Sequence, residues 1–354
     1  MNSEKTTPSM GKNKKVRNIL ILIFSVIFLF AGIFCVYADQ MLSKINYIPD
    51  DTSGSSASSR LQTGSLFSPG VESDGSTSAK SGILGGLYHD DAITNILLLG
   101  VDDYQQNDPG RSDSMLLVSV DTRHKKLKLT SFMRDMYVAI PGHSNNKLNT
   151  PYHFAGGGGE GAKLTVRTIE ANFGADIDRY VIISNSAFDK IVDKLGGVTM
   201  TITAAEANLI NQNSGDPRYN LRAGTFNLSG KQAHYYSRIR AIGDDFERTE
   251  RQRKVFASLA NKFKTESIGT IYSALSETLS LVTTNMSKNE VLSMAGNSLT
   301  YLNYPLSQNR IPADGEYYSD NLSVGNVLVP DLDASRKRVA DFIYEKDLPT
   351  KTYQ

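Results

Sequence analysis

A twenty-residue apolar run, Ile19–Ala38, contains Ser25 and Tyr37 as its only polar side chains. Twenty such residues match the roughly 30 Å hydrocarbon core of a bilayer. A secretory signal peptide has a shorter apolar region that ends in a small-residue cleavage site. We therefore predict a retained transmembrane helix over residues 18–38, which divides the chain into parts on opposite sides of a membrane.

The segments that flank this run differ in composition. Residues 1–17 hold five basic side chains and one acidic side chain, which predicts a cytoplasmic N-terminal tail. Residues 39–87 are rich in serine and glycine, and this composition predicts a flexible extracellular stalk. The folded part, residues 88–354, is then expected outside a bacterial, Gram-positive cell membrane that the protein crosses once.

Composition excludes several classes of protein. The 354 residues have a net charge of +1, without the basic excess of nucleic-acid-binding proteins, so no nucleic-acid partner is expected. The single cysteine, Cys35, lies in the apolar run, so the later chain can form neither an intrachain disulfide nor a cysteine-ligated zinc site. No HExxH, Walker A or GxSxG motif is present.

The rest of the chain alternates between two hydrophobic patterns. Apolar runs bounded by turn residues predict strands, and apolar residues at helical spacing predict helices. The predicted strands cover residues 94–101, 114–120, 126–132, 180–183 and 198–202. The predicted helices cover residues 161–173, 186–195, 230–237, 246–265, 268–281, 287–302 and 334–344. This order predicts an α/β fold, a sheet covered by helices on both faces, followed by a helical C-terminal part over residues 264–354.

The stretch His234–Lys254 concentrates side chains suited to phosphate. Planar guanidinium groups bind phosphate in bidentate fashion, and this stretch has five of them: Arg238, Arg240, Arg248, Arg251 and Arg253. Arg238 and Arg240 alternate as in an extended segment, so they are expected to point the same way. Asp244 followed by Glu247 predicts a capped helix start, with Asp245 and Gln252 on one helix face. The alternative interpretation is a solvated helix with Glu–Arg pairs.

Three further charged clusters adjoin predicted strand ends. They are Asp102-Asp103, Gly110–Asp113 and Arg134-Asp135. Loops at strand ends bind ligands in open α/β sheets, so these charges are expected to converge. Carboxylates that hold Mg²⁺, together with arginines that neutralise phosphate oxygens, are the groups that a metal-bridged pyrophosphate requires. For each cluster taken alone, a surface turn is the alternative.

Eight segments in register resemble the LytR-CpsA-Psr family of bacterial envelope proteins over residues 88–263. They are NILLLGVD, GRSDSMLLVSVD, LTSFMRD, IPG, NKLNTPY with GGGG, LGGVTM, AGTFNLSGKQAHYYSRIR and DDFERTERQRK. The resemblance implies an α/β/α sandwich with a central mixed sheet and a groove for a polyprenyl tail. It also implies a membrane-anchored phosphotransferase that moves a teichoic acid or capsule-type polysaccharide from undecaprenyl pyrophosphate to peptidoglycan as a phosphodiester. A non-catalytic, attenuator-type regulator that binds the lipid pyrophosphate, and a pyrophosphatase, are the alternatives.

The resemblance also assigns residues to roles. Asp102 and Asp113 match the metal-binding carboxylates, for Mg²⁺ or alternatively Mn²⁺. The residues matched to the pyrophosphate site are Arg111, Arg134, Lys147, Arg238, Arg240, Arg248, Arg251 and Gln252. The expected catalytic groups are Asp245, Arg134 and Arg240, with Asp245 either a general base or an orienter of arginines. Asp103-Tyr104 stands where an arginine often follows the first aspartate, so the metal ligand is Asp102 or Asp103; position favours Asp102.

Overall fold

The computed structural model describes residues 40–49, 87–102, 108–215, 220–267, 270, 273 and 277–345. The chain divides into two compact units, Met1–Lys44 and Ile45–Gln354, and the elements below belong to the second. The predicted transmembrane segment, residues 18–38, lies outside the described residues. Within the described ranges, no helix has both the length and the apolar character needed to cross a membrane.

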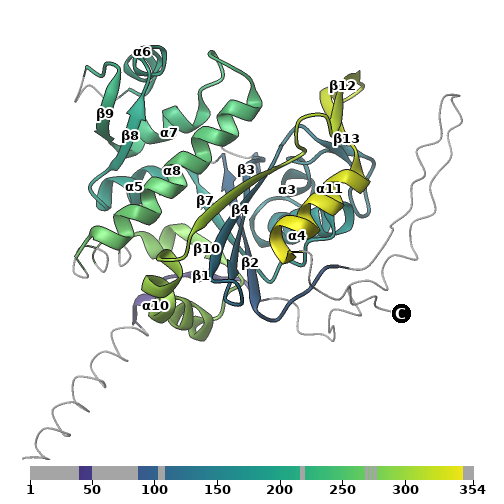
Figure 1. Cartoon of the computed structure of the whole chain (residues 1–354), viewed down its shortest axis with the longest axis horizontal. Coiled ribbons are helices and arrows are strands. Elements are labelled where there is room, and N and C mark those ends of the chain that lie inside the picture. Colours follow the sequence, from purple (N-terminus) through teal and green to yellow (C-terminus); the bar gives the residue numbers. More distant parts are fainter. Residues whose placement is uncertain are drawn as a thin grey trace, which may run out of the picture. The chain divides into compact units, whose positions relative to one another are not determined.

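A seven-stranded mixed sheet forms the centre of the second unit (Figure 1). Neighbouring strands are parallel in the pairs β1–β10, β7–β2 and β4–β11, and antiparallel in the other three pairs. In spatial order the strands are β1 (Asn46–Tyr47), β10 (Val282–Thr284), β7 (Arg179–Ser184), β2 (Ile93–Val101), β3 (Ser112–Asp121), β4 (Lys126–Phe132) and β11 (Leu306–Ile311). The predicted α/β fold with a central sheet is therefore confirmed.

Alternating residues of the central strands face two different apolar layers. Met115 and Leu117 of β3 pack with α4 (Gly158–Phe173), α11 (Leu332–Val339) and the π-helix Ala340–Tyr344. Leu116 and Val118 face the other way, toward α8 (Asp245–Thr265) and α10 (Lys288–Leu302). Figure 1 shows α4 and α11 on one side of the sheet and α8 on the other. Helices thus cover both faces, as the alternation of strands and helices predicted.

A smaller apolar cluster lies around the hairpin β8–β9 and involves α8. Its elements are α5 (Asn185–Lys194), β8 (Val198–Ile202), α6 (Ala204–Asn213), β9 (Gly224–Leu228) and α7 (Gly230–Arg238). The remaining described elements are β5 (Tyr137–Val138), β6 (Asn146–Lys147), α3 (Pro151–Phe154), the 3-10 helix Leu279–Leu281, β12 (Tyr317–Leu322) and β13 (Gly325–Pro330). Because α8 contacts both this cluster and the sheet, it fixes the position of the arginine-rich stretch.

Two expectations about domain organisation are wrong in part. The C-terminal part, residues 264–354, is not mainly helical, because it contributes β10, β11 and the hairpin β12–β13. The predicted stalk includes β1, which pairs with β10 at the edge of the sheet. Next to it, Ile48 packs so closely on Gly159 that a Cβ atom at that glycine would lie 2.6 Å from Ile48 Cδ1. Short strands with few apolar residues show too weak a hydrophobic periodicity to be recognised from the sequence.

Candidate active site

The antiparallel pair β2–β3 brings two carboxylates to one end of the sheet. Val101 pairs with Ser112, so Asp102 follows the end of β2 while Asp113 lies at the start of β3. The chain returns between them through Gly110, whose φ is +76° and where a Cβ atom would lie 2.3 Å from the Asp102 carbonyl oxygen. Only glycine accommodates both the left-handed backbone and this close approach.

Strand β4 ends beside them and contributes Arg134. Its Nη1 donates to Asp113 Oδ1 at 2.5 Å. Its Nε lies 3.4 Å from Asp135 Oδ2, and Asp135 Oδ1 is 3.0 Å from Lys147 Nζ. Lys147, predicted to contact phosphate, is thus linked to the site through Asp135.

The end of α7 and the residues just after it contribute two exposed arginines to the site. Arg238 is the last residue of α7, and Arg240 follows it by two residues, so they do not lie in the extended segment expected from the sequence. Their side chains nonetheless approach the same group of carboxylates. Arg238 Nη2 lies 3.7 Å from Asp102 Oδ2 and 3.9 Å from Asp113 Oδ2. Arg240 Nε lies 3.7 Å from Asp245 Oδ1.

Helix α8 begins at the site as predicted. The Asp244 side chain accepts hydrogen bonds from the N–H groups of Phe246 and Glu247, which confirms the N-cap. Within the first turn, Arg248 Nη2 donates to Asp245 Oδ2 at 2.9 Å, and Arg248 Nη1 donates to the Asp113 carbonyl oxygen at 3.1 Å. One buried guanidinium therefore connects the helix start to the start of β3.

The accumulated charges perturb ionisation in the site. Burial raises the pKa of Asp113, but Arg134, Arg248 and Arg238 more than offset this, so its pKa lies below the ordinary value. Burial lowers the pKa of Arg240, and the positive charges of Arg134 and Arg248 lower it further. An arginine whose charge is disfavoured by other arginines gains from an added anion.

The remaining residues that were predicted to contact the pyrophosphate do not all lie in the site. Gln252 lies in the site, where its Oε1 accepts a hydrogen bond from Ser114 Oγ at 3.2 Å. Arg111 is exposed beside Asp108. Arg251 lies elsewhere: it is buried and donates to Glu206 Oε1 and to the carbonyl oxygens of Ile239 and Ile242. This arginine fixes the chain after α7 rather than facing the site.

Three site residues were given no role from the sequence, although Asp135 belongs to one of the predicted charged clusters. Asp135 bridges Arg134 and Lys147, Ser114 binds Gln252, and Asn185 Nδ2 donates to Asp102 Oδ1 at 3.4 Å. Asp135 could have been given a role, since it directly follows Arg134. Asn185 could not, because only the parallel pairing of β7 with β2 brings it close to Asp102. Asp103, the alternative metal ligand, lies outside the described residues.

The two carboxylates suit a hard cation in their donor chemistry. Mg²⁺ is usually held by one or two carboxylates together with substrate phosphate oxygens and water. Oδ2 of Asp102 and Oδ2 of Asp113 lie within 4 Å of the same Arg238 nitrogen, so both oxygens already face one positive group. The residues present therefore fit a magnesium ion that a substrate phosphate helps to hold.

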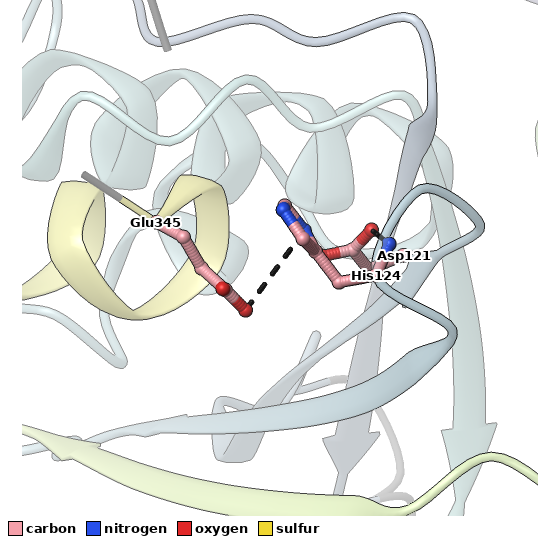
Figure 2. A group of neighbouring side chains, drawn as sticks. All are labelled: Asp121, His124 and Glu345. Carbon is pink, nitrogen blue, oxygen red and sulfur yellow. Dashed lines mark hydrogen bonds and ion pairs between the residues drawn. The ribbon is translucent and has the colours of Figure 1, made fainter. Parts of the chain in front are cut away.

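A second group of ligand-type side chains lies at the opposite end of β3. Asp121, His124 and Glu345 approach one another in Figure 2. Buried Lys128 already interacts with this group, with its Nζ 2.7 Å from Asp121 Oδ2 and 3.0 Å from Glu345 Oε1. A metal ion would have to compete with that ammonium group, so we interpret this group as a structural ion-pair network.

A family model described as the LytR_cpsA_psr family matches residues 63–341. Over 179 residues the chain is 36% identical to a protein of Oceanobacillus iheyensis named polyisoprenyl-teichoic acid–peptidoglycan teichoic acid transferase TagU, which covers 50% of this chain and 53% of that protein. The chain spans about half the length of the curated relatives it matches.

Solved structures share the fold. One described as TagT bound to LIIa-WTA has a TM-score of 0.58 at 24% identity and covers 72% of this chain and 92% of its own. Another, described as a LytR-CPS2A-psr family protein with bound octaprenyl pyrophosphate lipid, has a TM-score of 0.56 at 22% identity and covers 76% and 100%. At these identities the likeness concerns the fold.

Proposed function

Because this chain belongs to the LytR_cpsA_psr family, we propose that it is a phosphotransferase that moves a teichoic acid or capsule-type glycopolymer from undecaprenyl pyrophosphate to peptidoglycan. The observation that carries the proposal is the position of Arg238, which faces Asp102 and Asp113 at distances longer than a hydrogen bond. A guanidinium whose other terminal nitrogen makes a long, 3.4 Å hydrogen bond with His234 Nε2 can turn to a pyrophosphate while the carboxylates bind a metal ion. The names of the teichoic acid transferase and of the lipid-bound structure support the same chemistry.

The proposed reaction is displacement at phosphorus. A peptidoglycan sugar hydroxyl attacks the phosphorus atom that bears the glycopolymer. The new P–O bond forms, the P–O bond to the lipid phosphate breaks, undecaprenyl phosphate leaves, and the hydroxyl loses its proton to a base. Positioning and charge neutralisation supply most of the rate of such a step.

The site residues divide this work. Arg238 and Arg240, with side chains 39% and 48% exposed, bind the pyrophosphate oxygens. Arg134 is hydrogen-bonded to Asp113 and adds positive charge near the same anion. Asp245 faces the guanidinium groups of Arg248, Arg240 and Arg134 at 2.7, 3.7 and 3.9 Å, which favours an orienting role over that of a base.

Mg²⁺ is the proposed cofactor, with Mn²⁺ as the alternative. Asp102 and Asp113 would hold it. When bound, the ion supplies positive charge to the phosphate oxygens as the transferred group moves. Arg238 and Arg240 supply the remaining positive charge.

The lipid and the membrane belong to the same proposal. We expect the polyprenyl tail on the sheet face beneath α8 and α10, where Leu129, Phe256 and Met294 form part of an apolar layer. Phe256 lies on α8, the helix that contributes Arg248 and Gln252 to the site. The chain is proposed to be a single-pass protein of the cell membrane with an extracellular site and an α/β/α sandwich fold.

Transfer from a lipid-linked donor to peptidoglycan oligomers by the purified full chain tests the function. Mg²⁺ is expected to stimulate wild-type turnover, and the double substitution Asp102→Asn with Asp113→Asn to abolish that stimulation. Asp320→Asn, at an exposed position on β12, is the matched control and should transfer normally. Full activity of the double variant in excess chelator would contradict the metal assignment. Lipid pyrophosphate binding without any transfer would support the non-catalytic regulator instead.

A further inference from the structure

A pocket of about 240 Å³ lies beside the candidate active site, between α8 and the strand β11. Its lining combines two basic side chains, two amides and one acid: Arg253, Gln308, Asn309, Arg310, Ala313 and Asp314. None of these residues is among the predicted contacts of the pyrophosphate. Arg253 is the fifth arginine of the stretch His234–Lys254, and the proposed reaction leaves it without a role.

Arg253 is a half-buried cation with neutral partners. Its Nε donates to Gln308 Oε1 and its Nη1 to Ser131 Oγ, both at 3.1 Å. Within the described part of the chain, no carboxylate lies at ion-pair distance from it. Burial lowers the pKa of Arg253; the charge of Glu250 opposes this, and the charge of Arg310 lowers the pKa further. A cation that has lost hydration without gaining a counter-charge gains from binding an anion.

Arg310 presents a second guanidinium in a fixed plane. Its guanidinium carbon lies 4.0 Å from the centroid of the Phe246 ring. Its Nε donates to the Pro312 carbonyl oxygen at 3.0 Å and its Nη2 to Asp314 Oδ1 at 2.6 Å. Stacking on the ring and these two bonds hold the group in place, and no described residue accepts a hydrogen bond from Nη1.

The two guanidinium groups lie on the same face of the sheet. Side chains alternate along a strand, so Gln308 and Arg310 face α8, where Gln308 binds Arg253, whereas the Asn309 side chain faces the opposite side of the sheet. Two guanidinium groups carry several N–H donors that together match the oxygens of a phosphate.

We propose that this pocket is a second oxyanion site, which binds a phosphate or phosphodiester group. Five residues separate Arg248 from Arg253, which corresponds to about 7.5 Å along α8. A polymer whose pyrophosphate end occupies the candidate active site can therefore reach the pocket with its next phosphates. This assignment of the ligand to a phosphodiester of the glycopolymer rests on the proposed function; the oxyanion site itself does not.

Binding of inorganic phosphate to the full chain in detergent micelles tests the pocket directly. The measurement is equilibrium dialysis with Arg238→Gln as the background, so that binding at the candidate active site is weakened. In that background Arg253→Gln should weaken phosphate binding by about tenfold, since a charge-assisted hydrogen bond is lost. Asp314→Asn should tighten binding by about two- to threefold, because the side chain of this acid is 89% exposed and screened. Unchanged affinity in both variants, with normal thermal melting, would overturn the proposal.

Transfer assays then distinguish the source of the phosphate. With wild-type Arg238, the Arg253→Gln variant is expected to raise KM by about tenfold for a donor whose polymer contains phosphodiesters. A donor that carries only the pyrophosphate should show no change. If phosphate binding falls but KM is unchanged for both donors, the pocket binds free phosphate and the assignment to the polymer is wrong. If neither donor is transferred by the wild type, the proposed function fails while the binding result stands.

Discussion

Arg240 and Arg248 both contact Asp245, yet solvent reaches them very differently. The Arg248 side chain is 2% exposed and hydrogen-bonded to Asp245, whereas the Arg240 side chain is 48% exposed and lies 3.7 Å from it. A buried guanidinium with several partners positions its neighbours, and an exposed one with a single distant partner can reorient toward an anion. Binding and positioning are thus divided between two residues of one type.

Substitution of Arg240 by lysine tests this division. Lysine keeps the charge but loses the planar fork, so Arg240→Lys should transfer nearly as slowly as Arg240→Ala. A lost charge-assisted contact costs about 1.5–3 kcal/mol, which corresponds to transfer about ten- to a hundredfold slower. The measurement is transfer to peptidoglycan oligomers alongside thermal melting, with the exposed Arg222→Lys as control. Wild-type rates in both Arg240 variants would restore the solvated-helix interpretation.

The sequence predicted which residues form the site better than it predicted the partners of their side chains. Asp102, Asp113 and Arg134 were predictable because neighbouring strands end at a shared edge of the sheet. Arg251 belongs to the same charged stretch, but its partner Glu206 lies on α6, 45 residues earlier in the chain. Spacing along one helix cannot reveal such a partner, because it depends on how α6 packs against α7 and α8.

Strand β3 connects two charged groups of different character. Asp113, at its start, belongs to the candidate active site, and Asp121, at its end, is fully buried beside Lys128 and His124. Burial raises the pKa of Asp121, but hydrogen bonds from the His124 N–H and from Lys128 outweigh it, so its pKa lies below the ordinary value of 3.8. Because the folded-state pKa is depressed, the ionised carboxylate stabilises the fold above the unfolded-state pKa, and this stability is lost as pH falls through the folded-state value.

Chemical unfolding at several pH values tests whether ionised Asp121 stabilises the fold. The free energy of unfolding should fall between about pH 5 and pH 2, and Asp121→Asn should remove part of that fall. The same variant should lose about 2 kcal/mol at neutral pH, because Lys128 loses a charge-assisted hydrogen bond and keeps the more exposed Glu345 as its charged partner. Asp320→Asn, exposed on β12, serves as the control. An identical pH dependence in Asp121→Asn and the wild type would show that the network does not contribute in this way.

The long elements were predictable and the short ones were not. Strand β4 and helix α8 agree with the residues expected within one position at each end, because their hydrophobic patterns extend over many residues. Strand β10 has three residues, and β11 has an edge position with polar side chains at Ser307, Gln308 and Asn309. Such strands are stabilised by backbone hydrogen bonds to neighbouring strands. These bonds do not depend on side chains, so they produce no hydrophobic pattern in the sequence.

At the scale of the whole molecule, the proposed topology places the candidate active site outside the cell. The basic residues 1–17 are expected to remain in the cytoplasm, since positive charge before a membrane helix resists export. Protease added to intact protoplasts should digest the second unit and spare a tag at the N-terminus. Protection of that unit, with digestion only after lysis, would reverse the proposed orientation.

Strand β1 ends at Tyr47 and β2 begins at Ile93, and both belong to the seven-stranded sheet. In the proposed topology, the length of the chain between them would not set the distance from the bilayer, because both of its ends belong to one sheet. The few residues before Asn46 would set that distance instead. Deleting residues 55–80 should therefore leave transfer unchanged and alter the free energy of unfolding by less than about 1 kcal/mol, since closure entropy varies only with the logarithm of loop length. A transfer rate that falls as longer deletions are made would mean that the segment between β1 and β2 acts as a spacer.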